Sequence, residues 1–178
     1  DSLDLTTDGT ISVWAKFDIL SGTKTLVCRA NYGYCFSVYA TGKISWGKNG
    51  IDEVQSNTAL STGTWYYITV TRSGGSKSIY LDGVLDNSGS TADFQDLTTN
   101  IFIGSHLGSG NFLDGTMDEL SIWNRSLSAD EVSELAGIKV VDYSGFGNNG
   151  SRNFNTPPDF GRNFTAGKFG KGLVFDGD

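Results

Sequence analysis

Clustered positive charge is missing from this chain, which has 13 Lys and Arg residues against 20 Asp and Glu residues and a formal net charge of −7. Proteins that bind DNA or RNA neutralise phosphates with grouped Lys and Arg side chains, so nucleic acid is not an expected partner. The sequence also has no apolar run long enough to cross a bilayer. The N-terminus lacks a basic start followed by an apolar stretch, so we expect that any secretion signal has been removed.

Signatures of hydrolytic enzymes are missing too. Sugar-cleaving enzymes direct two acidic side chains into one cleft, where they act as acid, base or nucleophile. The adjacent pairs Asp52–Glu53 and Asp118–Glu119 would instead point to opposite faces of their strands. No Gly-x-Ser-x-Gly elbow is present, and the glycine-rich loop SHLGSGN around His106 lacks the lysine of a phosphate-binding loop. We therefore expect that the protein is not an enzyme.

Cysteine is scarce, because Cys28 and Cys35 are the only two in the chain. They flank a predicted turn that contains Asn31 and Gly33, where they can face each other across a hairpin. A cross-strand disulfide suits an exported protein and is the interpretation we favour; two buried thiols are the alternative in a reducing compartment. Two cysteines and the single histidine, His106, cannot supply the four ligands of a closed structural zinc site.

The residues that are present describe short strands and tight turns in a single domain over residues 1–178. The run Ile11–Phe17 alternates between apolar residues on one face and Ser12, Trp14 and Lys16 on the other. Further strands, each bounded by Gly, Asn, Asp or Ser, are predicted at Tyr34–Ala40, Lys43–Trp46, Trp65–Arg72, Ser78–Leu81 and Asn100–Ile103. Hairpin turns at Thr41–Gly42 and Asp82–Gly83 complete the pattern of an all-β antiparallel sandwich.

The most informative stretch is FLDGTMDELSIWNRSLSADEVSEL, from Phe112 to Leu135. A glycine turn leads into an alternating strand, and Ser128 with Glu131 forms a capping box that predicts one short helix near residues 128–136. This stretch resembles the last strand and closing turn of the laminin G-like, concanavalin A-like jelly rolls. A second stretch, Thr62–Leu85, has the Gly-x-Trp and Asp-Gly elements of the same family. The resemblance implies a two-sheet antiparallel jelly-roll sandwich.

A third match is out of order. The segments VVDYSGFGNNG and FTAGKFGKGLVFDGD resemble the opening segments of the family, although they lie within residues 138–178. This circular shift is explained by a permuted gene, by a frame cut from an array of repeats, or by exchange of the strands after Gly137 with a neighbouring subunit. Each explanation requires Gly172–Phe175 and Leu3–Leu5 to lie side by side, within one molecule or between two. Exchange would build a filament.

The resemblance further implies a structural calcium ion between an Asp-x-Ser-Gly segment and an Asp-Glu strand. The matching oxygen ligands are the side chains of Asp118, Asp142, Asn148 and Asp176. The alternative is an ordinary Asx-turn at Asp142, with Asp118 fixing a loop.

Aromatic side chains on the surface are the expected contacts for a sugar ring. Tyr32 and Trp46 are the candidates for such contacts, whereas Trp14 and Trp65 are expected in the core.

Export is also suggested by acceptor triplets for N-linked glycans at Asn124, Asn149 and Asn163, with ordinary turn chemistry as the alternative.

Taken together, these observations predict a non-catalytic extracellular module for adhesion or structure, as a repeat or subunit of a cell-surface array or filament. Its expected partners are a glycan, a matrix or cell-surface protein, or further copies of itself. A calcium-dependent carbohydrate-binding module is the alternative.

Overall fold

The computed structural model describes residues 3–29, 33–48, 51–90, 94–95 and 99–137, and the backbone of short strands at 139–140, 150–151, 164–167 and 170–173. No helix within these ranges has the length and apolar character needed to span a membrane.

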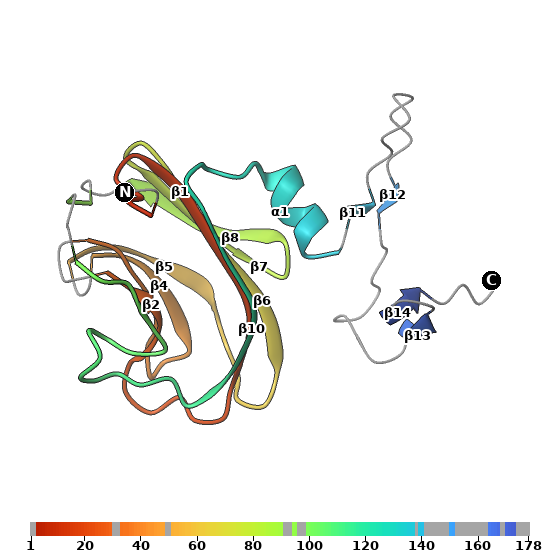
Figure 1. The fold of residues 1–178 in the computed structure, drawn as a ribbon, viewed down its shortest axis with the longest axis horizontal. Coiled ribbons are helices and arrows are strands. Elements are labelled where there is room, and N and C mark those ends of the chain that lie inside the picture. Colours follow the sequence, from red (N-terminus) through yellow and green to blue (C-terminus); the bar gives the residue numbers. More distant parts are fainter. Residues whose placement is uncertain are drawn as a thin grey trace.

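Two five-stranded antiparallel sheets face each other, as Figure 1 shows. The strands of the first are β1 (Asp8–Phe17), β6 (Trp65–Ser73), β7 (Ser76–Leu81), β8 (Val84–Ser90) and β10 (Gly115–Trp123). The strands of the second are β2 (Lys24–Cys28), β3 (Cys35–Val38), β4 (Lys43–Lys48), β5 (Ile51–Ala59) and β9 (Phe102–Ile103). The strand orders are β10-β1-β6-β7-β8, here named the β1 sheet, and β5-β4-β3-β2-β9, here named the β4 sheet. The predicted jelly-roll sandwich is confirmed.

The core lies between the sheets and follows the alternation of β1. Its four apolar residues Ile11, Val13, Ala15 and Phe17 are all 0% exposed. They pack in one cluster with apolar residues of the opposite sheet, among them Phe36, Ile44 and Trp46. The predicted face of β1 is therefore the inner face of the sandwich.

Two tryptophans were expected in the core and are not there. Trp14 is half-buried on the outward face of β1, where its ring lies 5.2 Å from that of Tyr67. Trp65 is 38% exposed at the start of β6, and the Lys16 ammonium lies 5.8 Å from its ring centroid. The expectation for Trp14 was wrong because the alternation of β1 places it with Ser12 and Lys16 on the outward face. The expectation for Trp65 was wrong because strand propensity does not decide which face of a sheet a residue occupies, and Trp65 pairs with the outward Lys16.

One flank of the sandwich is closed by side chains that join β5 to β8. The Asp86 carboxylate accepts hydrogen bonds from the backbone N–H groups of Asn57 and Thr58. The Asn87 side-chain amide donates to the Gln55 carbonyl at 2.7 Å. At the other flank, β10 and β9 are the terminal strands of their sheets among the described residues.

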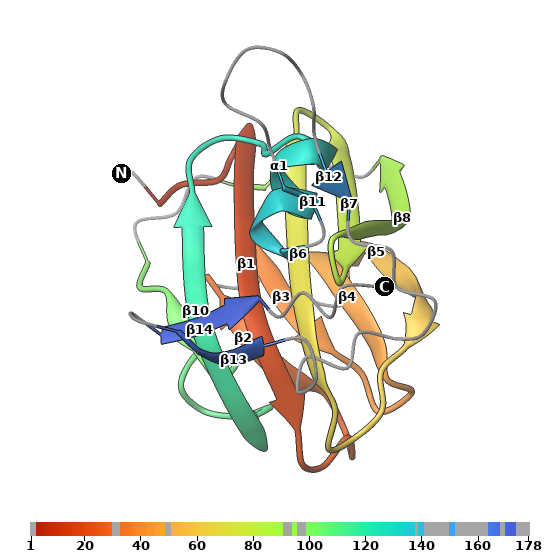
Figure 2. The same cartoon turned by 90° about the vertical axis from the view of Figure 1, so that its right-hand side faces the viewer.

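The helix α1 (Ala129–Leu135) covers part of the outer face of the β1 sheet, as Figure 2 shows. It begins at the predicted capping box, in which Ser128 accepts from the Glu131 N–H and Glu131 accepts from the Ser128 N–H. Val132 packs with Leu127 and Tyr80 in a second apolar cluster.

Two short ladders follow the helix. Strand β11 (Lys139–Val140) pairs with β12 (Gly150–Ser151), and β13 (Phe164–Gly167) pairs with β14 (Gly170–Leu173). Neither ladder belongs to the five-stranded sheets, and Figure 1 draws both outside them. Within the described residues, the segment from Gly172 therefore does not pair with Leu3–Leu5 of the same chain. Residues 174–178 lie outside the described ranges, and pairing between two copies stays a prediction.

Candidate functional site

The outer face of the β4 sheet collects polar side chains from neighbouring strands. The core residues Phe36, Trp46 and Val54 occupy one set of alternate positions, so the residues between them point away from the core. Across the ladder these outward positions form two rows, namely Thr25, Ser37, Ser45 and Gln55 in one, and Cys28, Cys35, Gly47 and Glu53 in the other.

Tyr39 follows β3 on the same outward face and connects the rows. Its hydroxyl donates a hydrogen bond to the Glu53 carboxylate. Burial, together with this hydrogen bond, raises the pKa of Tyr39 to about 12. The phenol therefore stays protonated at neutral pH and holds the carboxylate in place.

The accessible part of this face is narrower than the two rows. Thr25, Ser37 and Ser45 are at most 4% exposed, and the Ser37 hydroxyl donates to that of Thr25 at 3.3 Å. Tyr39 and Glu53 are half-buried and Gln55 is exposed. We name these three residues the Tyr39 patch. It offers a phenol, a carboxylate and an amide to a polar ligand. The phenol and the amide can both donate and accept hydrogen bonds, whereas the carboxylate can only accept them.

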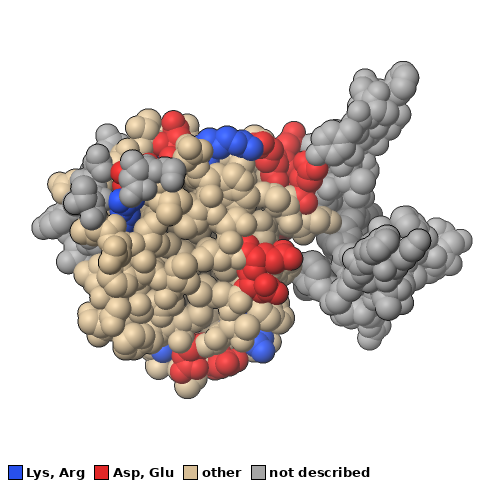
Figure 3. All heavy atoms as spheres, viewed as in Figure 1, with Lys and Arg blue, Asp and Glu red and all other residues tan. Residues whose placement is uncertain are grey.

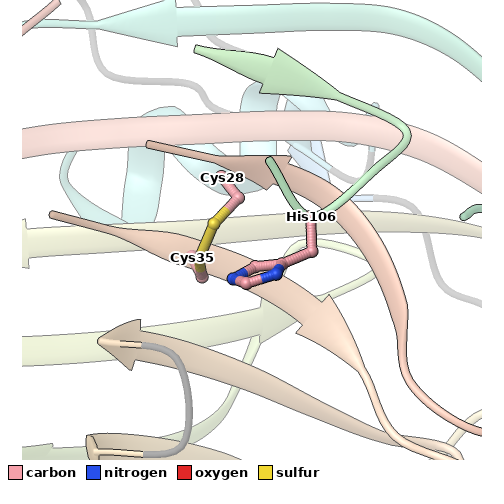
Figure 4. A group of neighbouring side chains, drawn as sticks. All are labelled: Cys28, Cys35 and His106. Carbon is pink, nitrogen blue, oxygen red and sulfur yellow. A yellow bond between two sulfur atoms is a disulfide. The ribbon is translucent and has the colours of Figure 1, made fainter. Parts of the chain in front are cut away.

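His106 lies on a tight turn at another part of the same sheet. The His106 backbone N–H donates to the Gly110 carbonyl at 2.8 Å, and the Ser109 N–H donates to the backbone carbonyl of His106 at 3.1 Å. Leu107 and Gly108 take φ values of 53° and 71°, which reverse the chain between them. The turn places the imidazole beside the Cys28–Cys35 disulfide, as Figure 4 shows.

The disulfide confirms one sequence prediction. Cys28 on β2 pairs directly with Cys35 on β3, and their sulfurs are bonded. The hairpin geometry on which the prediction rested is therefore present.

Of the two predicted sugar contacts, the structure describes Trp46, and Trp46 is not on this face. Trp46 is 0% exposed and points into the core, where its ring lies 5.2 Å from that of Phe94. The expectation that Trp46 lies on the surface was wrong, because Trp46 shares the inward face of β4 with Ile44. Tyr32 lies outside the described residues. Tyr39 is the aromatic residue that the structure places here, and the alternation of Cys35, Ser37 and Tyr39 was the signal that could have found it.

The predicted calcium ligands are only partly described. Asp118 lies on β10 in the β1 sheet, exposed, and its Oδ1 accepts the Glu119 N–H at 2.8 Å. Glu119 has φ 50° at a break in the β1–β10 register, which is a β-bulge. Asp142, Asn148 and Asp176 lie outside the described ranges, so the calcium site stays a prediction. Within those ranges, the one group of three potential metal ligands is Cys28, Cys35 and His106.

The glycosylation triplets are described only at Asn124, which is exposed. Asn149 and Asn163 lie outside the described residues.

Charge is dispersed over the face of the molecule that Figure 3 shows. Figure 3 shows small separate groups of acidic and basic side chains on a mostly uncharged face. A basic surface of the kind that binds phosphates is not seen in this view, in agreement with the negative net charge.

A small hollow of about 190 Å³ lies beside the closed flank, lined by Thr58, Leu81, Asp82, Val84, Leu85 and Asp86. Burial raises the pKa of Asp82, whose carboxylate accepts the Tyr67 N–H at 2.8 Å. Val84 and Leu85 are 62% and 52% exposed. Pockets that enclose small-molecule ligands usually have at least about 300 Å³, so the Tyr39 patch is the better candidate site.

Comparison with known proteins gives one family and a set of similar folds. The profile of the concanavalin A-like lectin/glucanases superfamily matches residues 1–133. No curated protein sequence matches the chain.

Three solved structures illustrate the shared fold. A proposed carbohydrate-binding protein from Bacteroides ovatus has a TM-score of 0.63 at 14% identity, over 72% of this chain and 40% of its own. Domain 4 of AbnA, an extracellular arabinanase from Geobacillus stearothermophilus solved with arabinotriose, has a TM-score of 0.60 at 21% identity, over 73% and 66%. The heptameric SAP-like pentraxin from Limulus polyphemus has a TM-score of 0.56 at 18% identity, over 74% and 70%. The match thus spans well under half of the first of these chains.

Proposed function

The chain belongs to the concanavalin A-like lectin/glucanase superfamily, and from this premise we propose that it is a non-catalytic, extracellular carbohydrate-binding module. The Tyr39 patch is the observation that carries the proposal. Sugar hydroxyls both donate and accept hydrogen bonds, and the patch offers the Glu53 carboxylate as an acceptor and the Gln55 amide as both. The ring of Tyr39 adds an apolar surface of the kind on which a sugar can lie.

The carboxylates of the outer face favour binding over cleavage. Among the described outward positions of β2 to β5, Glu53 is the one carboxylate, and Tyr39 already donates to it. Glycoside hydrolysis usually requires two carboxyl groups about 5 to 9.5 Å apart. A single engaged carboxylate suits a module that holds a sugar without cleaving it.

An extracellular location is supported by the disulfide, since such bonds persist in oxidising compartments. The exposed acceptor triplet at Asn124 agrees with this location. AbnA, whose domain 4 has a similar fold, is described as an extracellular enzyme and was solved with arabinotriose. Arabinotriose is therefore the first ligand to test.

The test is calorimetric titration of the full chain with arabinotriose and with the ligands that a glycan array returns. We expect Tyr39→Ala and Gln55→Ala to weaken binding at least about tenfold, a loss of about 1.4 kcal/mol per contact. Tyr39→Phe separates the ring from the hydroxyl. Its matched control is Tyr66→Phe. Tyr66 lies on β6 of the β1 sheet, away from the patch, and the substitution removes a hydroxyl that accepts the Ser61 N–H. No binding on the array, or equal binding by all variants, would contradict the proposal.

Self-assembly is a second candidate function, favoured by the flank at β10. This strand is terminal in the β1 sheet among the described residues, and Ile103 and Phe112 near it are 57% and 58% exposed. The hairpin β13–β14 pairs outside both five-stranded sheets. A copy of this hairpin is a candidate to pair with β10 of a neighbour and to extend an array on a cell surface.

Size-exclusion chromatography and electron microscopy test this candidate. The full chain is expected to multimerise without sugar, and a chain ending at Gly137 is expected to stay monomeric. A peptide of residues 164–178 should bind the shortened chain. A monomeric full chain at all concentrations would eliminate assembly and leave the sugar proposal untouched.

We also propose that the module binds a structural calcium ion. Of its four predicted ligands, Asp118 lies within the described residues and is exposed. We expect Ca²⁺ to raise the melting temperature relative to a chelator, and Asp118→Asn to abolish this rise. Asp130→Asn, another exposed aspartate, is the matched control. An unchanged melting temperature for the wild-type chain would eliminate calcium.

A further inference from the structure

Cys28, Cys35 and His106 meet on the outer face of the β4 sheet, although His106 is distant from both cysteines in sequence. We propose that these three side chains form a redox-gated binding site for a zinc ion. The site is closed while the disulfide exists and becomes available when the disulfide is reduced. It is separate from the Tyr39 patch and independent of sugar binding.

The three ligand atoms are close enough to reach the spacing of a zinc site by small movements. One ligand atom from each residue lies within 4.8 Å of the others. Zinc–sulfur and zinc–nitrogen bonds of about 2.3 and 2.0 Å place tetrahedral ligand atoms roughly 3.5 to 3.8 Å apart. Reduction lets the two sulfurs separate toward this spacing, while small side-chain rotations bring the imidazole nearer. No rearrangement of the strands is required.

The environment of the three residues suits a partly shielded ion. Cys28 and Cys35 are 0% and 2% exposed, whereas His106 is half-buried. Phe102 lies opposite Cys28 in the β2–β9 ladder and adds an apolar neighbour. The sulfurs are thus screened from solvent, and the histidine side provides the route by which an ion enters.

His106 is held in place by backbone contacts that do not involve the disulfide. The Gly104 N–H donates to the Leu26 carbonyl at 2.9 Å, and the Thr25 N–H donates to the Asn111 carbonyl at 2.9 Å. These bonds attach both ends of the loop to β2, and the His106–Gly110 bridge closes it. The imidazole therefore keeps its position after reduction, as a preorganised ligand must.

The chemistry balances with a dithiol as the reductant. The dithiol gives two electrons and two protons to the disulfide, which becomes two thiols, and is itself oxidised to a disulfide. Zn²⁺ then displaces the two thiol protons and accepts a lone pair from the neutral imidazole. Two thiolates neutralise the ion, so no net charge is buried.

The resulting site differs from a closed structural zinc site. Three protein ligands leave the fourth position to water or to a ligand from solution. The scarcity of cysteine and histidine excludes a four-ligand site in this chain, but it does not exclude an open one with three ligands.

The test is zinc titration of the full chain against a chromophoric chelator, with a phosphine as reductant because it does not compete as a thiol ligand. We expect the reduced chain to bind one zinc ion and to release about two protons, and the oxidised chain to bind none at this site. Cobalt in place of zinc should give thiolate-to-metal charge-transfer absorption. His106→Ala should weaken binding at least about 10- to 100-fold, the loss typical for merely mis-orienting a ligand. Ser109→Ala, in the same turn, should bind like the wild-type chain.

Equal zinc affinity of the oxidised and reduced chains would overturn the proposal, because the ion would then be held by residues other than the two cysteines. An unchanged affinity of His106→Ala would overturn it as well. Near-UV circular dichroism follows the fold during reduction. A reduced chain that loses this signal and does not regain it with zinc would also contradict the site.

Discussion

The indole Nε1–H of Trp46 donates to the backbone carbonyl of Thr71 at 2.9 Å, from the β4 sheet to the β1 sheet. It is a buried hydrogen bond across the middle of the sandwich, surrounded by the rings of Tyr34, Phe36 and Phe94. It therefore joins the two layers through a buried aromatic cluster, against which the Arg72 and Lys77 side chains also pack, at 4.6 and 4.8 Å from the Phe94 ring centroid.

Trp46→Phe should destabilise the fold, because the variant removes this donor and leaves a small cavity. Losing one partner of a buried hydrogen bond costs about 1–3 kcal/mol. Urea denaturation should show a lower midpoint with an unchanged slope. The control is Trp65→Phe at the 38%-exposed position, expected within about 0.5 kcal/mol of the wild type. Equal midpoints for both variants would show that the contact contributes nothing.

Gly42 and Gly63 form a matched pair of glycines with left-handed φ values of 76° and 75°. A Cβ on Gly42 would lie 2.5 Å from the Leu60 carbonyl oxygen, whereas one on Gly63 meets nothing within 4 Å. We expect Gly63→Ala to cost about 1–2 kcal/mol of left-handed strain, and Gly42→Ala to cost clearly more. Because both variants carry the same left-handed strain, the difference between their denaturation midpoints measures the clash of the new Cβ with the Leu60 carbonyl oxygen. Identical losses would mean that the hairpin at Thr41–Gly42 adjusts to a side chain.

The stability of the first turn of α1 depends on pH through the ionisation of Glu131. The Arg125 guanidinium and the Ser128 backbone N–H lower the pKa of Glu131 from its ordinary 4.5 to about 2. Because the folded pKa is the lower one, the contact stabilises fully above about pH 4.5 and is lost as the pH falls toward 2. An NMR titration should report a pKa near 2, and Arg125→Met should move it back toward 4.5.

The Ser128 cap can be measured separately. Ser128→Ala removes the side chain that accepts the Glu131 N–H at 3.2 Å and should cost about 1 kcal/mol. Ser133→Ala, inside the same helix, removes a different bond, from its hydroxyl to the Gly83 carbonyl at 2.9 Å, and so separates the cap from this contact with the β7–β8 turn. A Ser128→Ala variant as stable as the wild type would show that the helix is held by its contacts with the sheet, among them Val132 packing, and not by the cap.

The disulfide is expected to contribute stability as well. Cys28 and Cys35 are separated by 7 positions, and closing so short a loop contributes about 2–3 kcal/mol in the chain-entropy description. The double variant Cys28→Ser/Cys35→Ser should therefore unfold at a lower denaturant concentration yet keep its near-UV circular dichroism. A variant that is unfolded in buffer would mean that the disulfide is needed for the fold itself.

Local patterns predicted local structure well. The alternation of Ile11–Phe17, the hairpin at Asp82–Gly83 and the capping box at Ser128 each depend on residues close in sequence, and each is present. The full lengths of β5 and β8 were not predicted, because SNTA and DNSGS are polar runs whose extended form is supported by neighbouring strands. A pattern confined to one segment does not contain that support.

The candidate site was harder to predict than the fold. Trp46 and Tyr39 lie on opposite faces of adjacent strands, and the sequence does not tell which face meets the other sheet. The proximity of His106 to Cys28 depends on the pairing of β2 with β9, a contact between distant segments. Tertiary pairing, rather than local composition, decides both.

The ladder between β1 and β10 sets how the module responds to tension. The chain enters β1 at Asp8 and leaves β10 at Trp123, and Thr10 pairs with Trp123, so both attachment points lie at the same end of the ladder. A pull on these segments unzips backbone bonds one after another instead of shearing them together. The Thr10 hydroxyl donates to the Arg125 carbonyl and accepts from the Leu127 N–H at 2.9 Å each, and these two bonds reinforce this end of the ladder. A stretched chain of such modules would yield at this corner and absorb load by extension.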